Sequence, residues 1–573
     1  MCKTIIGGGS LPRPRVCEAN SVVSEANVLP PLRGCVRLNR PSVTPPLLQK
    51  QQDFYILPII LIYFYFYLLY TDFMSFINND DLKTRKVLMG SCGCALDLGD
   101  GSERGLYVNQ DYILQKMRKI HRGISLMYTY YPNDKEWPTR ACMINPGDEP
   151  KGAWDSPYEN YFPYRGGREG LRDNEPFNFM KEIRRHGMDV VLTMTIDPAL
   201  KEEDLIPVAE DLRPYGRVLL RVNHECTGSW FCFNKRASYQ QLADFFVLVC
   251  KVMHEHAPNV KVILCAGMFQ EAEGKLEMED IFLEAHKAAD IWSGDQYLSL
   301  HWGWPVDVAT KETNAYACYD TDQVYEKAKA TLHRLREITG QDKPFVLSEL
   351  NGDGDVTGAY EQANMMRHFM ERLEKDDEKW LSAFTLYQFR DDGRLGLEIT
   401  DPNNSDVGIE QPILGMYRKQ LQKEFFSQKM SDGGALSLPA KLRWSSSEDA
   451  EGIEVDVKIE KDPVFAELYF ENDLRPLNLM IEFGGYWFYK APGVKCIDLM
   501  SYFFENPLKA GESRNMKLRF FAPPADGLNH PADGSDPFKA PDGDWMNNSY
   551  TTLPALPKIR IEYEPVALAK HYD

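Results

Sequence analysis

Two glutamates in this chain each follow a short apolar stretch of the kind that forms a buried strand. Glu225 comes shortly after the stretch that begins at Val218, and Glu349 comes after the stretch that begins at Phe345. Burying a carboxylate is costly unless it has a partner or a task. Two carboxyls together predict cleavage of a glycosidic bond, because one protonates the leaving oxygen while the other attacks the anomeric carbon or activates water.

Polar residues surround the first of these glutamates. If the strand runs on to its end, alternation places Arg221, Asn223 and Glu225 on one face and turns His224 away. We expect Arg221 to favour the ionised form of Glu349 and Asn223 to hydrogen-bond a sugar hydroxyl. His224 is expected to shape the site. The alternatives are a barrel-filling ion pair for Arg221 and a purely structural role for His224.

Aromatic residues follow two of the polar strand ends. Trp230 lies just past Glu225, and Trp302 and Trp304 lie past Tyr297. Aromatic rings suit the apolar faces of pyranose rings, although packing in a core is about as common. We therefore expect the three tryptophans to contact a sugar.

Strand and helix patterns alternate between residues 84 and 428, which predicts a (β/α)8 TIM barrel as the catalytic domain. The alternative is an open doubly wound sheet, but no glycine-rich phosphate loop follows any of the strands. The eight candidate strands are Val87–Gly90, Gly123–Tyr130, Asp189–Thr195, Arg217–Val222, Val260–Ala266, Ile291–Tyr297, Pro344–Ser348 and Ser382–Gln388.

The pattern of apolar and polar residues changes after the barrel. Residues 429–573 contain short runs that alternate between apolar and polar residues, such as Ile453–Ile459, with Gly, Pro and Asp between them. This pattern predicts an all-β sandwich that serves as an accessory domain.

The N-terminal part has a different character. Residues 1–53 lack periodicity and are predicted to be disordered. Residues 54–73 begin with an apolar segment, 54–70, that is short for a membrane span. It is either a membrane anchor, which would place the enzyme outside the cell or on its surface, or an artefact of a gene start placed upstream of Met74. In the second case no export signal is visible.

Composition excludes several classes of function. The formal net charge is −19 over 573 residues, which argues against nucleic acid as a partner because phosphate binding needs a basic face. The twelve cysteines include no CxxC pair, and no second histidine completes an HExxH zinc motif around His224 and Glu225. We therefore expect neither a metal nor a cofactor.

The run from Arg221 to Phe231 resembles the fourth-strand motif of glycoside hydrolase family 26, a clan A family of retaining barrel enzymes that includes β-mannanases. The resemblance implies that Glu225 is the acid/base and that Glu349, on the seventh strand, is the nucleophile. It also implies that Tyr297 lies beside the nucleophile, where we expect it to hydrogen-bond Glu349. The similarity is limited to motifs of the barrel, and the eighth strand lacks the tryptophan that many clan A enzymes place under the sugar.

These observations together predict a retaining glycoside hydrolase that cleaves β-glycosidic bonds in a polysaccharide or oligosaccharide. Two other interpretations remain open. One is a non-catalytic carbohydrate-binding protein with a degenerate barrel, and the other is a barrel lyase that uses the carboxyls only for proton transfer.

Overall fold

The computed structural model describes residues 76–77, 82–100, 107–139, 141, 158, 161–301, 316–391, 395–531 and 544–564. Residues Phe73–Asp573 form one compact unit that contains a parallel barrel and a set of antiparallel sheets. The segments predicted over 1–53 and 54–73 lie outside the described residues. In the part of the chain that is described, no helix combines the length and the apolar character that a membrane span needs.

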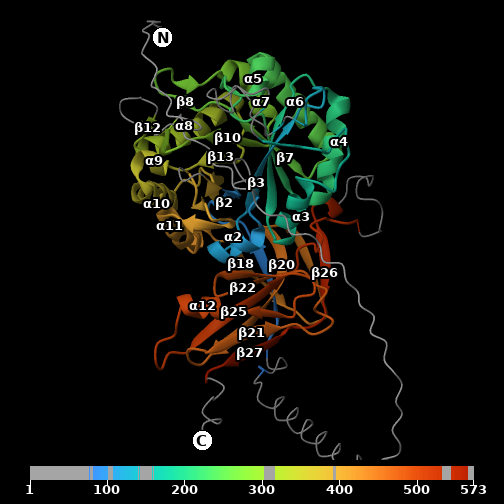
Figure 1. Cartoon of the computed structure of the whole chain (residues 1–573), viewed down its shortest axis with the longest axis vertical. Helices are drawn as coiled ribbons and strands as arrows, with labels where there is room; N and C mark the ends of the chain where they lie inside the picture. The colour runs from blue at the N-terminus through green and yellow to red at the C-terminus, as the bar shows by residue number, and fades with distance from the viewer. Residues whose placement is uncertain are drawn as a thin grey trace, which may run out of the picture. The chain divides into compact units, whose positions relative to one another are not determined.

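Eight parallel strands close into a barrel with helices around it (Figure 1). The ring is closed because the first strand, β2, pairs with both the second and the last. This confirms the predicted TIM barrel. In order along the chain the strands are β2 (Ala95–Gly99), β3 (Gly123–Tyr130), β5 (Asp189–Ile196), β6 (Val218–Val222), β7 (Val260–Cys265), β10 (Ile291–Asp295), β13 (Phe345–Leu350) and β14 (Ala383–Leu386).

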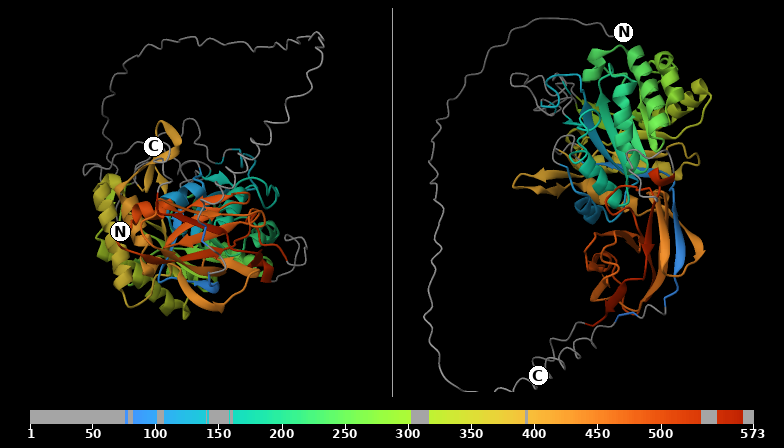
Figure 2. Two further views of the ribbon diagram at one scale, coloured as in Figure 1. Left: turned by 90° about the horizontal axis from the view of Figure 1, so that it is seen from below. Right: turned by 90° about the vertical axis from the view of Figure 1, so that its right-hand side faces the viewer.

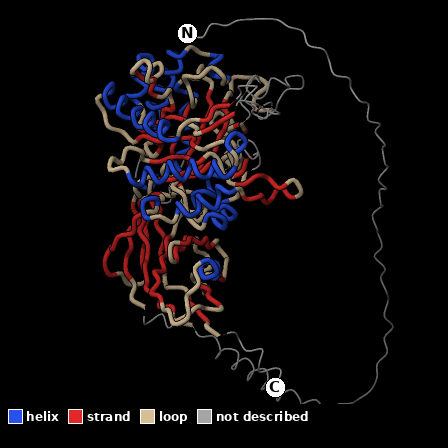
Figure 3. Tube along the Cα trace, turned by 90° about the vertical axis from the view of Figure 1, so that its left-hand side faces the viewer, coloured by secondary structure: helices blue, strands red, loops and turns tan. Residues whose placement is uncertain are grey.

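Helices cover the outside of the strands (Figure 3). Their ends follow local rules: the carboxylate of Asp320 accepts the N–H groups of Asp322 and Gln323 at the start of α8, which ends at Thr339 and is followed by the capping residue Gly340 with φ 67°. The barrel helices are α2 (Gln110–Met117), α3 (Phe177–Arg185), α4 (Glu202–Leu212), α5 (Cys232–Arg236), α6 (Tyr239–His256), α7 (Glu279–Ala288), α8 (Thr321–Thr339), α9 (Gly354–Thr357), α10 (Ala359–Lys375) and α11 (Pro412–Leu421).

The inside of the barrel is filled in layers. One apolar layer takes one residue from each of seven strands, and side chains two positions further along a strand face the same interior. The next layer is accordingly polar and includes Thr193, Arg221, Ser293 and Ser348, all of them buried. The apolar layer consists of Ala95, Val191, Leu219, Ile263, Ile291, Val346 and Ala383.

The second domain is a β-sandwich, as predicted. Its core joins side chains from an eight-stranded sheet and a three-stranded sheet. The larger sheet contains β1 (Arg85–Gly90), β18 (Lys429–Ala435), β19 (Ala440–Ser446), β20 (Asp449–Ile459), β22 (Leu479–Phe483), β23 (Tyr486–Lys490), β25 (Arg514–Phe521) and β26 (Ser549–Leu553), and the smaller one contains β21 (Phe465–Tyr469), β24 (Cys496–Asp498) and β27 (Lys558–Glu562).

One predicted barrel strand belongs to this second domain. β1, which covers the predicted strand Val87–Gly90, pairs antiparallel with β18 and β20. Figure 2 shows it as the blue strand among the orange and red strands of the sandwich. The first barrel strand is β2 instead, so the prediction gave the correct number of strands but assigned the first one wrongly.

Buried polar contacts join the barrel to the sandwich. Asp189, at the start of β5, accepts a hydrogen bond from Arg217 of the barrel at 2.8 Å and lies 3.3 Å from the hydroxyl of Ser447 in the sandwich. That hydroxyl also lies 2.7 Å from the carbonyl oxygen of Arg122. These contacts lie at the amino-terminal ends of the barrel strands, opposite the end where barrel active sites are built.

Candidate active site

Arg221 is the central group of the candidate site. It projects from β6 into the barrel, where its Nη2 lies 2.7 Å from Glu349 Oε1 and its Nη1 lies 2.9 Å from Asp295 Oδ2. Its Nε donates to the Thr193 hydroxyl at 2.8 Å. All three nitrogens of a fully buried guanidinium therefore have partners, which fixes two carboxylates from different strands around one cation.

Glu349 reaches this site because of an irregularity in β13. Strict alternation would put it outside the barrel with Phe345 and Leu347, which pack in the outer core. The pairing between β10 and β13 shifts register at this point, so that Leu347 pairs with Gly294 and Glu349 pairs with Asp295. Such shifts near active sites redirect side chains, and this one turns Glu349 inward.

Tyr297 completes the contacts of Glu349. Its hydroxyl donates to Glu349 Oε2 at 2.6 Å, as the sequence predicted. The ring of Tyr387 meets the ring of Tyr297 edge-on, with the centroids 6.1 Å apart. Both oxygens of Glu349 thus accept a hydrogen bond, one from a cation and one from a phenol.

Glu225 stands on a turn rather than on a strand. β6 ends at Val222, and both Asn223 and Glu225 have left-handed backbone conformations, with φ of 45° and 50°. The prediction that Arg221, Asn223 and Glu225 share one strand face is therefore wrong, because regular alternation stops at Val222.

The carboxylate of Glu225 is held by Trp230. The indole Nε1 donates to Glu225 Oε2 at 3.0 Å, while the rest of Trp230 is 45% exposed. Gly228 makes this close packing possible, since a Cβ there would lie 2.6 Å from the indole ring. Trp230 is thus fixed at one edge and open to solvent at the other, as a platform for a ligand requires.

Charge and burial set the protonation of Glu225 and Asp295. Burial, then the negative charges of Asp295 and Glu349, raise the pKa of Glu225 well above its ordinary value, against the opposing effects of Trp230 and Arg221. Burial and the charge of Glu349 raise the pKa of Asp295 to about 7, although Arg221 lowers it. The site therefore favours a protonated Glu225 near neutral pH.

His224 enters the site, contrary to the expectation that it turns away. Its Nε2 lies 4.0 Å from Glu349 Oε1 and 3.5 Å from the Tyr161 hydroxyl, and its ring packs against Phe231. Burial and the charge of Arg221 lower its pKa well below the usual value. The imidazole is therefore neutral, and its Nδ1 has no hydrogen-bond partner among the described residues.

Asn223 bonds the backbone of the neighbouring strand, and the substrate contact expected of it stays a prediction. Its Oδ1 accepts the N–H of Ile196 at 2.6 Å, and its Nδ2 donates to the carbonyl oxygen of Ile196 at 3.2 Å. The side chain is buried against the end of β5 and ties the turn after β6 to the neighbouring strand.

Sequence reasoning missed Asp295. This residue ends β10 as Glu349 ends the regular part of β13, so the same signal of an acid closing an apolar strand was present. Trp302 and Trp304, predicted to contact a sugar, lie outside the described residues. In the ranges that the structure describes, no cluster of three or more potential metal ligands is found.

No family model matches the chain, and neither does any curated protein. Solved structures that are similar include a family 26 β-mannanase from Bacteroides ovatus, with 13% identity and a TM-score of 0.35 over 59% of this chain and 90% of that chain. A monomeric β-xylosidase from Caulobacter crescentus has 9% identity and a TM-score of 0.39 over 76% of this chain and 98% of that chain.

A family 51 α-L-arabinofuranosidase from Bifidobacterium longum has 10% identity and a TM-score of 0.37, over 77% of this chain and 98% of that chain. Likeness at this level decides nothing about activity. The resemblance of the sequence motifs to family 26 therefore stays a prediction, and any functional assignment has to rest on the geometry of the site itself.

Proposed function

We propose that this protein is a retaining glycoside hydrolase that cleaves β-glycosidic bonds in a polysaccharide or oligosaccharide. One observation carries the proposal: two glutamates at the mouth of a TIM barrel have different surroundings, one bound by a cation and a phenol and the other buried near negative charge. Glu349 accepts hydrogen bonds from Arg221 and Tyr297, whereas burial and neighbouring negative charge favour the protonated form of Glu225. Double displacement needs this division of roles.

In the first step, Glu349 is the nucleophile. A carboxylate oxygen forms a bond to the anomeric carbon while the bond from that carbon to the leaving oxygen breaks. The guanidinium of Arg221 and the hydroxyl of Tyr297 orient the carboxylate before the attack. Hydrogen bonds from fixed donors cost no reorganisation when the reaction occurs.

Glu225 is the general acid and then the general base. Its proton moves to the leaving oxygen in the first step, which leaves Glu225 ionised next to the newly neutral ester of Glu349. In the second step Glu225 takes a proton from water as the water oxygen bonds to the anomeric carbon, and Glu349 departs as a carboxylate. The loss of the negative charge on Glu349 in the intermediate lowers the pKa of Glu225 and so favours this change of role.

His224 and Trp230 are assigned to substrate binding. The neutral imidazole lies beside the nucleophile, where it can hydrogen-bond a sugar hydroxyl. The half-exposed indole of Trp230 is fixed to the acid, where it can support the apolar face of a ring on the leaving-group side. The mechanism requires no metal or cofactor.

The test compares three proteins on a panel of β-linked polysaccharides with reducing ends quantified: wild type, Glu225→Gln and Glu349→Ala. We expect wild type to cleave at least one glycan and each substitution to reduce kcat/KM by several orders of magnitude. Glu482→Gln is the matched control, because Glu482 is also a buried glutamate paired with an arginine, Arg519, but lies in the sandwich. It should retain activity.

The outcomes separate the alternatives. Binding of a glycan without release of reducing ends would support a carbohydrate-binding protein with a degenerate barrel. Products that carry a new carbon–carbon double bond would support a lyase. Full activity in both active-site variants would refute the two-glutamate assignment. The anomeric configuration of the first product, followed by NMR, tests retention.

A further inference from the structure

A cysteine thiol lies inside the barrel, next to the candidate active site. Cys265 is the last residue of β7, which pairs with β6 on one side and with β10 on the other. Ile263, two positions earlier, belongs to the apolar layer that fills the barrel. Alternation therefore turns Cys265 into the same interior, one layer nearer the mouth, and the residue is completely buried there.

The backbone of Cys265 holds the turn that carries Glu225. Its carbonyl oxygen accepts the N–H of Cys226 at 3.3 Å and lies 3.3 Å from the sulfur of Cys226. Cys226 directly follows Glu225, so these contacts fix the chain at the residue next to the candidate acid. Any residue at position 265 would offer the same carbonyl oxygen, and only the contacts of the side chain can explain a thiol here.

The side chain of Cys265 adds two hydrogen bonds. Its sulfur accepts the backbone N–H of Glu225, and its S–H donates to the carboxylate of Asp295. Asp295 is also bound by Arg221, whose Nη1 lies 2.9 Å from Asp295 Oδ2. A buried free cysteine usually behaves as a small apolar residue. Cys265 instead joins the backbone of the candidate acid to the neighbouring acid of the site.

The thiol is a neutral donor between charged groups. Burial, then the negative charge of Asp295, raise the pKa of Cys265 well above its usual value, although Arg221 lowers it. The sulfur therefore keeps its proton and always has a hydrogen to donate. This bond favours the ionised form of Asp295, whereas burial and the charge of Glu349 oppose it. The charge of Asp295 in turn raises the pKa of Glu225.

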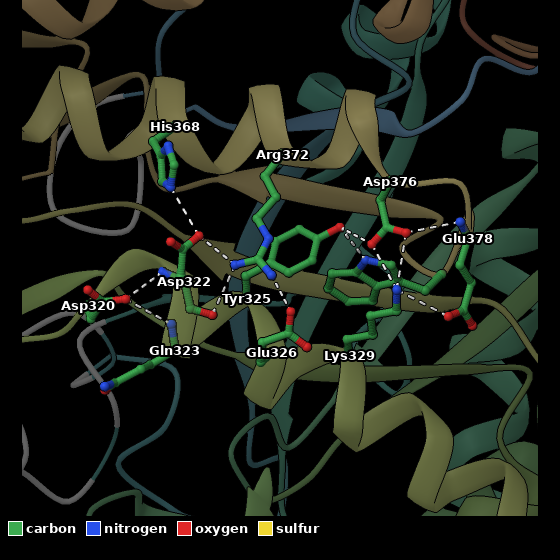
Figure 4. Close-up of polar contacts among 11 residues, drawn as sticks. Asp320, Asp322, Gln323, Tyr325, Glu326, Lys329, His368, Arg372, Asp376 and Glu378 are labelled. Carbon is green, nitrogen blue, oxygen red and sulfur yellow. Dashed lines mark hydrogen bonds and ion pairs between the residues drawn. The ribbon is translucent and has the colours of Figure 1, made fainter.

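Polar contacts between neighbouring elements do not by themselves indicate a role in a reaction. On the helices that cover the barrel, Asp322 of α8 is bound by His368 and Arg372 of α10 (Figure 4). These contacts join two helices and include neither candidate glutamate. The thiol of Cys265 is different, because one of its partners is the backbone of Glu225 and the other is an acid that acts on the protonation of Glu225.

We propose that Cys265 is a positioning residue for the acid/base, because its thiol fixes the turn that carries Glu225 and joins that turn to the carboxylate of Asp295. The role in catalysis rests on the proposed function. Without the thiol, Asp295 is protonated over a wider pH range and its charge acts less on Glu225. The pKa of Glu225 then falls, and the fraction of protein with a protonated acid falls with it.

The experiment uses the full chain and the variants Cys265→Ala and Cys265→Ser. Cys250→Ala is the matched control, because Cys250 is also a buried free cysteine of the barrel domain but lies on α6. The first measurement is the dependence of kcat and KM on pH. The second needs no activity: the infrared band of the protonated carboxyl of Glu225, identified by its loss in Glu225→Gln, is followed against pH without substrate.

We expect Cys265→Ala to lower kcat about fivefold, the size of one lost hydrogen bond, and to change KM little. The basic limb of the pH–rate profile and the loss of the carboxyl band should both move to lower pH. Cys265→Ser keeps a donor and an acceptor and should recover most of both effects, whereas Cys250→Ala should behave as wild type. In an Asp295→Asn background, Cys265→Ala should no longer shift the band.

Two results would overturn the inference. One is a carboxyl band that titrates at the same pH in wild type and in Cys265→Ala. The other is an equal shift of the band with and without Asp295→Asn, because the effect of the thiol would then not pass through Asp295. A protein that hydrolyses no glycan but shows the predicted shift would support the positioning of Glu225 by Cys265 and refute the proposed hydrolase instead.

Discussion

Replacing Arg221 by methionine should lower the free energy of unfolding of the protein. At an effective dielectric constant of 20, contacts of 2.7 Å with Glu349 and 2.9 Å with Asp295 each represent roughly 6 kcal/mol of attraction. Desolvation of the buried ions offsets most of this gain. Removing the cation alone leaves two acids facing each other in the barrel, so we expect a loss of about 3–5 kcal/mol of stability.

The loss should depend on pH with a defined sign. The folded-state pKa of Asp295, about 7, is already above that of an unfolded aspartate, so its ionisation destabilises the fold as pH rises. Without Arg221 this effect grows. The difference in stability between the variant and wild type should be smallest below about pH 5 and widen above about pH 7, and adding Asp295→Asn to the variant should recover part of it.

The difference in stability between Arg221→Met and wild type is measured by thermal and urea denaturation, followed by tryptophan fluorescence, from below about pH 5 to above about pH 7. Arg519→Met is the matched control, because Arg519 also bridges two glutamates, Glu454 and Glu482, but in the sandwich and with 17% of its side chain exposed. It should cost less stability and leave kcat/KM unchanged. An Arg221→Met protein within about 1 kcal/mol of wild type at pH 8 would refute the reasoning, since a broken buried pair costs more than that.

Four further predictions concern single contacts. Tyr297→Phe should lower kcat/KM at least about tenfold, the value of a hydrogen bond to a charged group, whereas Tyr325→Phe, which removes an equally short bond to Asp376 outside the site, should not. Asp295→Asn should move the basic limb of the pH–rate profile to lower pH, because the charge of Asp295 raises the pKa of Glu225. Glu225→Gln should have a higher Tm than wild type at pH 8, with the difference vanishing near pH 4, since a carboxyl with a raised pKa destabilises the fold as it ionises. Ser447→Ala should lower the Tm and leave kcat/KM unchanged, because it removes only a hydroxyl that joins the sandwich to the barrel.

Much of the barrel was predictable because parallel strands buried on both faces are rich in apolar residues. Strand Gly123–Tyr130 has the bounds that the sequence predicted. The first strand was assigned wrongly because β1 and β2 are both short, and their pairing partners lie far along the chain. β1 alternates between buried and exposed residues, as an antiparallel strand does, whereas β2 is buried throughout.

The candidate site was predicted in its residue types more fully than in its geometry. Glu349 was chosen because it closes an apolar strand, and Arg221 because of strand alternation. Alternation holds for Arg221 but fails for Glu349 and Glu225. A register shift turns Glu349 inward, and two left-handed residues carry Glu225 beyond the strand. The register shift has no signal in the sequence. The left-handed turn has none either, because non-glycine residues rarely adopt φ near 50°. Asp295 did have a signal, its place at the end of β10.

The most direct test of the central claim is to trap the covalent intermediate. Wild type and Glu225→Gln are incubated with an activated 2-deoxy-2-fluoro glycoside of each candidate sugar, and the digested protein is analysed by mass spectrometry. We expect one glycosyl group to become attached to the peptide that contains Glu349, and Glu349→Ala to remain unlabelled. A label on any other residue, or a protein that hydrolyses its glycan with inversion of the anomeric centre, would contradict the account.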